Sequence, residues 1–201
     1  MSRTILLRGD HVSLALPIRE DFQDLSLWND PEYRCYGSKP NAVITEDPEE
    51  RIKKILKNWH REHYFSIIRN GDETFLGFLS FSSLISAQEL HIGLLRERGK
   101  GYGTEAVRLG LTWTFAIKNV PTVVLFVTTD NKRAIRAYKK AGFKEVAVIP
   151  NMLCIGYTYK DMLLMLAQQD TWLKENRAFV EDCLKRSGYP LDALPPLHII
   201  Q

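Results

Sequence analysis

Residues 88–118 read QELHIGLLRERGKGYGTEAVRLGLTWTFAIK, and this stretch decides the fold. It begins with an alternation of polar and apolar residues from Glu89 to Leu94, which is the period of a β-strand. It ends with apolar residues at helical spacing from Ala106 to Ile117. Between the two runs, glycine occupies every second position from Gly99 to Gly103. The stretch therefore predicts a strand, a glycine loop and a helix, in that order.

The glycine loop is suited to hold a phosphate group. Glycine lets the backbone bend and expose successive N–H groups, and these groups lie where the predicted helix begins. The unpaired donors and the positive dipole end of that helix face the same point. Two basic side chains add cationic charge. We therefore predict an anion-binding loop made of Arg98, Gly99, Lys100, Gly101, Gly103 and Thr104.

Three kinds of glycine loop compete for this stretch. A P-loop needs Gly-x-x-x-x-Gly-Lys-Ser/Thr, and this loop lacks that spacing. A dinucleotide site needs Gly-x-Gly-x-x-Gly early in a βαβ unit, which the residues here do not fit. The third pattern is Arg/Gln-x-x-Gly-x-Gly/Ala, matched by Arg98, Gly101 and Gly103. A flexible basic turn without a ligand is the structural alternative to all three.

The third pattern resembles the acyl-CoA pyrophosphate loop of the GNAT N-acetyltransferase superfamily. A second motif, N-x-x-A-I-x-x-Y-x-x-x-G-F over residues 131–143, is similar to the GNAT stretch that follows the fifth strand. Residues 87–92 with the following Gly-Lys-Gly-Tyr-Gly-Thr-Glu-Ala look like one branch of that superfamily. This branch includes ribosomal-protein N-terminal acetyltransferases and small-molecule amine acetyltransferases. The resemblance covers roughly residues 5 to 167.

The hydrophobic pattern predicts the remaining elements. We expect a strand at 4–16, either continuous or as two half-strands joined at residues 8–10. We expect further strands at 63–69, 74–83, 86–95, 123–128, 143–149 and 157–167. We expect helices at 19–28, 48–59, 106–117, 132–141 and 168–186. The Asn70-Gly71-Asp72 segment signals a hairpin, and Pro150-Asn151 a turn.

This order predicts an α/β (α+β) fold with a single mixed, mostly antiparallel central sheet and helices on both faces. The GNAT resemblance implies that the sheet is splayed between its fourth and fifth strands, 89–95 and 123–128. Residues 1–167 would form the acetyltransferase domain. The C-terminal helix and proline-containing tail, 168–201, would pack on the same domain or on a partner subunit, so a homodimer contact is one role open to them.

Residues 45–51 form an acidic cluster with two interpretations. Their charge could bind a cationic substrate such as a polyamine. The residue order fits a helix start better, with Asp47 as N-cap, Pro48 at the first helical position, and two glutamates in the first turn.

The resemblance also implies a cosubstrate site and a chemistry. Acetyl-CoA would lie in the gap between the splayed strands, with its pantetheine arm pairing with backbone groups as a pseudo-strand. A backbone N–H near Leu94 would stabilise the developing oxyanion. Tyr138 would hydrogen-bond the departing thiolate, its alternative being a core aromatic. Asn131 would bond the pantetheine or cap the following helix.

The attacking amine needs a base. Glu89 is the first candidate, and His91 shares its strand face by the two-residue period. The structural alternatives are a solvated glutamate and a packed histidine. In the family the first two helices border the acceptor pocket, so Asp30, Glu32 and Tyr33 are predicted to line it.

The bulk composition excludes several classes of protein. The 201 residues are 45% hydrophobic and 25% charged, with a net charge of +3, which is too mild to indicate nucleic-acid binding. No apolar run approaches the roughly 20 residues that span a bilayer, and the N-terminus lacks a signal-peptide pattern. Three cysteines and five histidines are scattered without metal-ligand spacing. We therefore expect a cytoplasmic protein with reduced thiols, no metal, and neither nucleic acid nor membrane as a partner.

The function predicted from these observations is an acetyl-CoA-dependent N-acetyltransferase. The acceptor would be a primary amine, either a protein N-terminus or a small molecule. Two alternatives remain open at this point. One is a non-catalytic acyl-CoA-binding regulatory module, and the other is a nucleotide-binding protein that uses the same loop.

Overall fold

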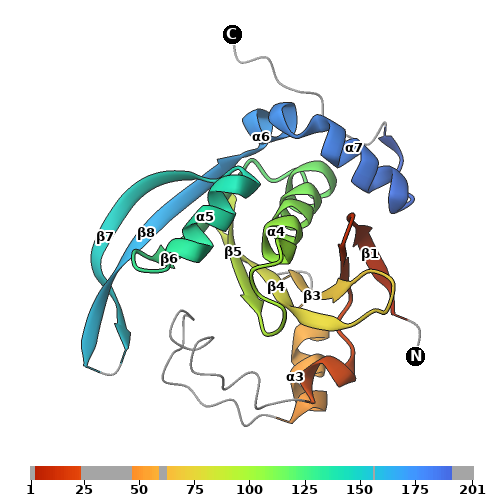
Figure 1. Cartoon of the computed structure of the whole chain (residues 1–201), viewed down its shortest axis with the longest axis horizontal. Coiled ribbons are helices and arrows are strands. Elements are labelled where there is room, and N and C mark those ends of the chain that lie inside the picture. Colours follow the sequence, from red (N-terminus) through yellow and green to blue (C-terminus); the bar gives the residue numbers. More distant parts are fainter. Residues whose placement is uncertain (1–2, 24–46, 59–62, 156, 192–201) are drawn as a thin grey trace.

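One open sheet organises the molecule, seen in a computed structural model that describes residues 3–23, 47–58, 63–155 and 157–191. Its eight strands run in the order β1-β2-β3-β4-β5-β6-β8-β7 (Figure 1). All neighbouring pairs are antiparallel except β5 with β6, which are parallel. The predicted mixed, mostly antiparallel sheet is therefore confirmed. The strands are β1 Ile5–Arg8, β2 Val12–Ala15, β3 His63–Arg69, β4 Phe75–Leu84, β5 Ala87–Leu94, β6 Thr122–Thr128, β7 Lys144–Ile155 and β8 Thr158–Gln168.

The helices connect these strands. They are the 3-10 turn η1 Arg19–Phe22, then α3 Pro48–Lys57, α4 Tyr102–Thr112 with the π-helical turn η2 Trp113–Ile117, α5 Lys132–Ala141, α6 Gln169–Glu175 and α7 Arg177–Arg186. None of the helices within the described ranges is long and apolar enough to cross a membrane. The helix predicted at 19–28 begins as η1, and its remainder from residue 24 lies outside the described residues.

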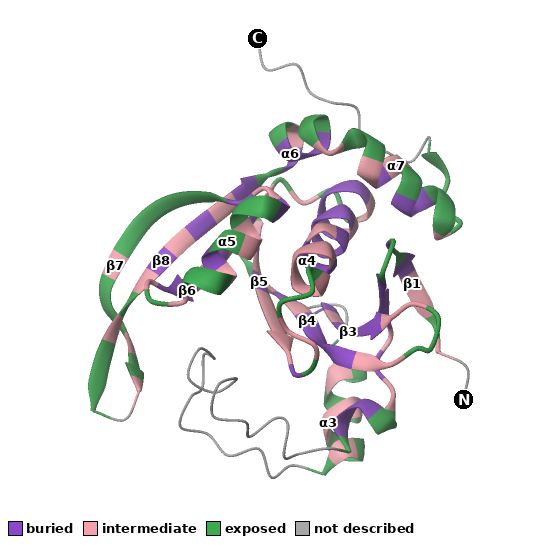
Figure 2. Ribbon diagram, viewed as in Figure 1, coloured by how far each residue is buried: buried purple, intermediate pink, exposed green. Residues whose placement is uncertain are grey.

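Two apolar clusters show that both faces of the sheet are covered (Figure 2). On β4, Leu79 and Phe81 pack into the main core beneath α4, while Phe78 belongs to a second cluster. That second cluster is covered by η1 and α3 through Phe22 and Ile55. Alternate residues of one strand therefore serve opposite layers, as the strand period requires.

The gap between β5 and β6 is the feature that positions a site. Their parallel pairing is confined to Ala87–Glu89 against Thr122–Val124. Beyond it, β5 stays paired with β4 as far as Leu94, and β6 stays paired with β8 as far as Thr128. Each strand thus turns toward its other neighbour and leaves a wedge between them. The predicted fourth and fifth strands correspond to β5 and β6, so the predicted splay is confirmed. It leaves backbone N–H and C=O groups without a strand partner.

The predicted turn at Pro150-Asn151 is wrong. β7 continues through it to Ile155, and its pairing with β8 shifts register between Ile149 and Leu153. β7 is the edge strand of the sheet, and Pro150 lies where its pairing with β8 is interrupted, so the ladder does not need the N–H that proline lacks. The irregularity is stabilised because the backbone N–H of Asn151 donates to Asp161 Oδ1 at 2.9 Å. The chain reverses only after Ile155.

The single C-terminal helix predicted over 168–186 is two helices. Asn176 separates α6 from α7, and its side chain explains the break. Its Nδ2 donates to the carbonyl of Trp172 at 3.0 Å, and its Oδ1 accepts from Arg108 at 3.1 Å. Such side-chain bonds compete with helical ones. Both helices bury apolar side chains in the main core. The tail beyond residue 191 lies outside the described residues, so its dimer contact stays a prediction.

Gly142, which ends α5, provides a test of how the C-terminal helices are attached. It has a φ of 104°, and a Cβ there would lie 2.6 Å from Trp172 Cδ1. We expect Gly142→Ala to lower the free energy of unfolding by about 2 kcal/mol, from backbone strain and displacement of the indole. Gly71→Ala is the control, because its φ is 94° but no atom lies within 4 Å. Urea denaturation should show a clearly smaller loss for the control, and equal losses would contradict the contribution of Trp172.

Candidate active site

The loop between β5 and α4 has the backbone shape of an anion site. Gly99 and Gly101 have φ values of 86° and 87°, which place them in the left-handed region. No atom lies within 4 Å of a Cβ built at either position, so backbone conformation rather than space requires glycine there. Gly101 is the N-cap of α4 and provides no side-chain cap. The start of α4 is therefore left open.

The first N–H groups of α4 are available as donors. The first helical bond runs from the N–H of Glu105 to the carbonyl of Gly101 at 3.2 Å. The N–H groups of Tyr102, Gly103 and Thr104 precede it and have no acceptor within the helix. Three donors and the positive end of the helix dipole thus point toward the loop. This arrangement fits a phosphate group.

The loop is tied to the end of β5 by two contacts. Arg98 Nε donates to the carbonyl of Leu94 at 2.8 Å. A Cβ on Gly103 would lie 3.1 Å from Leu94 Cδ1, so the first turn of α4 packs directly on the last residue of β5. The predicted cosubstrate residues Leu94, Arg98 and Gly103 therefore meet beside the gap. Lys100, in the same loop, forms an exposed ion pair with Glu97 at 3.3 Å.

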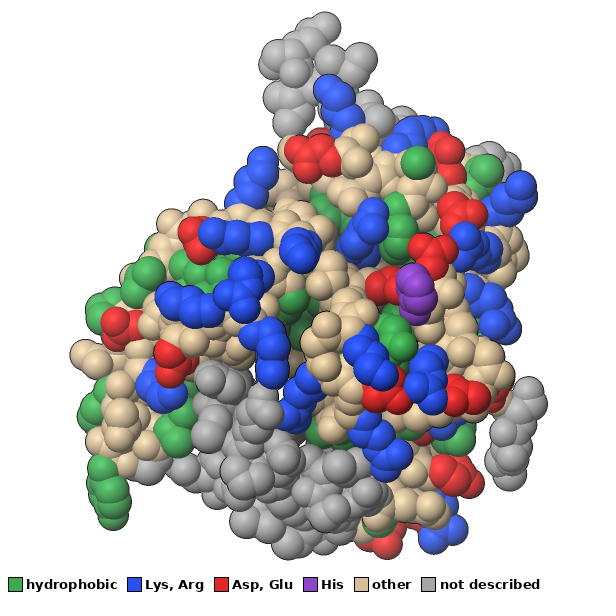
Figure 3. Space-filling model, viewed as in Figure 1, with side chains coloured by type: hydrophobic (Ala, Val, Ile, Leu, Met, Phe, Trp, Pro, Cys, Tyr) green, Lys and Arg blue, Asp and Glu red, His purple; other side chains and the backbone are tan. Residues whose placement is uncertain are grey.

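Cationic charge also surrounds α5, which follows β6 on the other side of the gap. Lysine and arginine side chains gather over its exposed face (Figure 3). The helix has no acidic residue in its first turn and five exposed basic residues, Lys132, Arg133, Arg136, Lys139 and Lys140. A surface with one sign of charge raises the rate at which a polyanion arrives.

Glu89 and His91 are brought together, as their spacing predicts. His91 Nε2 lies 3.7 Å from Glu89 Oε2 and 3.0 Å from Ser82 Oγ. Glu89 and Ser82 are directly opposed in the β4–β5 ladder, so all three side chains share one sheet face. Leu90 between them points into the main core on the opposite face. Ser82 was not found from the sequence, because only the strand register places it beside His91.

Tyr138 lies on α5, on the core side of the sheet. Its ring packs against the core and meets Phe143 edge-on with the centroids 6.1 Å apart. Burial raises the pKa of its hydroxyl to about 12. Within the part of the chain that the structure describes, this hydroxyl has no hydrogen-bond partner. Tyr138 is therefore a protonated donor at neutral pH that is free to serve a ligand.

The other predicted residues have separate positions. Asn131 Oδ1 accepts from the N–H of Ala134 at 3.1 Å, so Asn131 caps α5. Its predicted contact with pantetheine stays a prediction, and the amide nitrogen and the second lone pair of Oδ1 could serve it. Asp30, Glu32 and Tyr33, predicted to line the acceptor pocket, lie outside the described residues.

A comparison with known families agrees with this geometry. A model of the acetyltransferase (GNAT) domain matches residues 11–144, which is more than half of the chain. The chain belongs to the GNAT acetyltransferase family. The matched residues include the glycine loop, the splayed strands β5 and β6, and the candidates Glu89, His91 and Tyr138. The match ends at the start of β7.

Among relatives of this GNAT chain, spermidine N(1)-acetyltransferase of Escherichia coli K12 is 28% identical over 88 residues. That match covers 44% of the chain and 47% of the relative, so the chain spans about half the length of this curated relative. The solved spermidine N-acetyltransferase of Vibrio cholerae, in complex with CoA and spermine, has a TM-score of 0.70 at 22% identity, covering 81% of this chain and 98% of that one. The ribosomal-protein-S5-alanine acetyltransferase of Vibrio fischeri has a TM-score of 0.71 at 17% identity, covering 86% and 99%. Both structures show the same fold.

Proposed function

We propose that the protein transfers an acetyl group from acetyl-CoA to a primary amine. The observation that carries this proposal is the wedge between β5 and β6, which opens beside the uncapped start of α4. A ligand with an amide-rich arm and a pyrophosphate has the groups that these two features need. Acetyl-CoA has both, and membership of the GNAT family supports this choice.

In the proposed complex, the pantetheine arm lies along the unpaired part of β5, residues 90–94, and of β6, residues 125–128. Its amides satisfy backbone groups that the splay leaves without a strand partner. The pyrophosphate accepts hydrogen bonds from the N–H groups of the loop, residues 98–104, and from the first turn of α4. Loop and wedge meet at Leu94, so one extended molecule can occupy both.

The reacting groups approach from the two faces of the sheet. Glu89 and His91 lie on one face, and Tyr138 lies on the core side with α5. Side chains on both faces of the sheet can reach a thioester that lies in the wedge. The amine nitrogen attacks the carbonyl carbon, the new C–N bond forms, and the C–S bond breaks. The proton of the amine passes to Glu89 or His91, directly or through water.

Tyr138 serves the departing sulfur in this scheme. With a pKa raised to about 12, its hydroxyl is a weaker acid than an ordinary tyrosine. It therefore stabilises the thiolate by donating a hydrogen bond rather than by giving up its proton. A backbone N–H near Leu94 is the proposed donor to the carbonyl oxygen as it gains charge.

The acceptor is proposed only as a primary amine. The relatives include a spermidine acetyltransferase and a ribosomal-protein-S5-alanine acetyltransferase, which supports testing both polyamines and alanine peptides. The acidic start of α3 does not favour a polyamine site, because its carboxylates are already engaged. Asp47 caps the N–H groups of Glu49 and Glu50 at 2.8 and 3.3 Å. Glu49 also pairs with Arg19, and Glu50 with Lys53, each at 3.3 Å.

The experiment is a turnover assay with CoA binding measured in parallel. Acetyl-CoA consumption, corrected for hydrolysis, is followed with spermidine, spermine, simple primary amines and peptides that begin with alanine or serine. We expect CoA to bind and one acceptor class to be acetylated. Binding without turnover on any acceptor would favour the non-catalytic module. Failure to bind CoA, with ATP or NAD binding instead, would contradict the assignment of the loop.

A further inference from the structure

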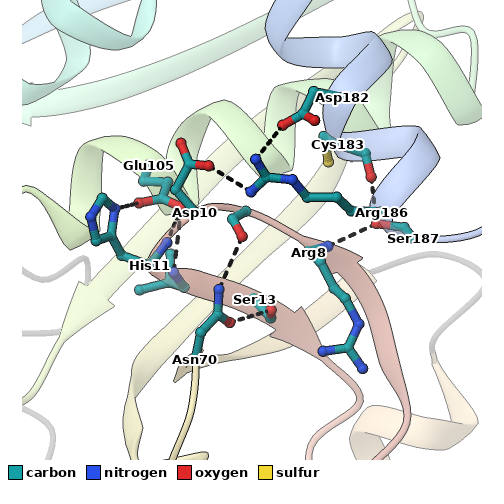
Figure 4. A network of polar contacts seen from close by, with 12 residues as sticks. Arg8, Asp10, His11, Ser13, Asn70, Glu105, Asp182, Cys183, Arg186 and Ser187 are labelled. Atoms are coloured by element: carbon teal, nitrogen blue, oxygen red, sulfur yellow. Dashed lines mark hydrogen bonds and ion pairs between the residues drawn. The ribbon is translucent and has the colours of Figure 1, made fainter.

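The carboxylate of Glu105 lies in a set of donors formed by the turn between β1 and β2 (Figure 4). Its Oε1 accepts from the backbone N–H of His11 at 2.9 Å and from that of Val12 at 3.4 Å. Its Oε2 lies 3.0 Å from His11 Nδ1. The Glu105 side chain is 13% exposed and the His11 side chain 71% exposed, so the carboxylate is held at the edge of the protein surface. We call this turn, residues 9–12, the carboxylate seat.

The backbone of the carboxylate seat leaves space for the carboxylate of Glu105. A Cβ on Gly9 would lie 2.3 Å from Glu105 Oε1 and 2.9 Å from the carbonyl oxygen of Val12, so a larger residue there must displace the carboxylate and strain the turn. The N–H of Gly9 donates to the carbonyl of Val12 at 2.9 Å, which closes the turn around it. Hydrogen bonds to an ionised acceptor are stronger than those between neutral groups. The contact is therefore a specific attachment rather than a chance approach.

This attachment acts on the part of α4 that faces the loop. Glu105 follows directly after the three residues whose N–H groups are open, and it makes the first helical bond itself. A carboxylate in a first helical turn is expected simply to stabilise the helix dipole. Here the carboxylate of Glu105 accepts hydrogen bonds from the carboxylate seat, and these bonds hold the first turn of α4 in place. The first turn of α4 cannot move without breaking these contacts.

We propose that Glu105 is a positioning residue, which holds the first turn of α4 and its N–H donors in register for the pyrophosphate of acetyl-CoA. This inference rests on the proposed function. It also predicts a change in CoA affinity opposite in sign to the change that electrostatic repulsion alone would give. Removing a negative charge near a phosphate site would tighten the binding of CoA through weaker repulsion. Loss of positioning weakens it instead.

The test compares two variants on opposite sides of the contact. Glu105→Gln removes the charge and keeps the size, whereas Gly9→Ala keeps the charge and displaces the carboxylate. We expect each to raise the Kd for CoA and the KM for acetyl-CoA about tenfold. The rate at saturating acetyl-CoA and the KM for the amine should stay near those of the unmodified protein, because the reacting groups are untouched.

Asp10→Asn is the matched control. Asp10 lies in the same turn, but its carboxylate forms an ion pair with Arg186 of α7 at 2.5 Å and acts on Arg108 of α4 through charge rather than through a hydrogen bond. It should lower stability slightly and leave the Kd for CoA unchanged. Equal Kd values for the control and the two variants, or tighter binding by Glu105→Gln, would overturn the proposal.

A second measurement does not depend on CoA. Amide hydrogen exchange of residues 98–104 should be faster in Glu105→Gln and Gly9→Ala than in Asp10→Asn, because the anchored turn is released. Unchanged exchange there would also overturn the proposal. If exchange rises in both variants while the unmodified protein does not bind CoA, then the proposed function fails and the role of Glu105 in holding α4 is still established.

Discussion

Replacing Tyr138 with phenylalanine is expected to lower the rate of acetyl transfer about 100-fold, the lower end of what is lost when one preorganised hydrogen-bond donor to a developing negative charge is removed. The ring packs in the core beside Phe143, and phenylalanine keeps that packing. Only the hydroxyl is lost, and this hydroxyl has no partner among the described residues whose loss would disturb the fold. The affinity for CoA should therefore change by no more than about twofold.

The pH dependence makes this prediction sharper. Burial raises the pKa of Tyr138 to about 12, so the hydroxyl stays protonated from about pH 6 to pH 10. The ratio of rates between the unmodified protein and Tyr138→Phe should therefore be constant over that range. Tyr159→Phe is the control, since Tyr159 lies on β8 with 65% of its surface exposed. A Tyr138→Phe variant that turns over as fast as this control would remove Tyr138 from the mechanism.

Replacing Glu89 with glutamine is expected to lower kcat/KM about 100-fold at neutral pH, because a positioned base contributes at least that factor. Glu89 is the residue at which the pairing of β5 with β6 ends, so it lies at the vertex from which the wedge opens. It is also more buried than His91, with 23% of the side chain exposed against 41%. We therefore expect His91→Gln to have the smaller effect.

The two variants and Ser82→Ala distinguish the candidate bases in one assay. Ser82 Oγ lies 3.0 Å from His91 Nε2, so its loss should matter only if His91 is the base. If Glu89 is the base, Glu89→Gln should lower kcat/KM about 100-fold, while Ser82→Ala should keep kcat/KM near that of the unmodified protein. A kcat/KM close to that of the unmodified protein in both Glu89→Gln and His91→Gln would place the base outside this cluster.

Much of the fold followed from local patterns. The run from Glu89 to Ile117 specified a strand, a glycine loop and a helix because each depends on residues close in sequence. The same holds for Asp47 as the cap of α3. Such features are decided by backbone conformation and by bonds over three or four residues. The loop and the pair Glu89–His91 could be predicted for the same reason.

The tertiary structure alone decided the rest, because it depends on contacts between distant segments. The proline in β7 is tolerated only because that strand is at the sheet edge, and Asn176 breaks the C-terminal helix while bonding Arg108 of α4. Ser82 meets His91 through the register of two strands. The sequence by itself determined a GNAT-like strand, loop and helix with their candidate residues. Only the folded chain gave Glu105 its place, since its partners lie 93 and 94 residues away on β2 and the turn before it.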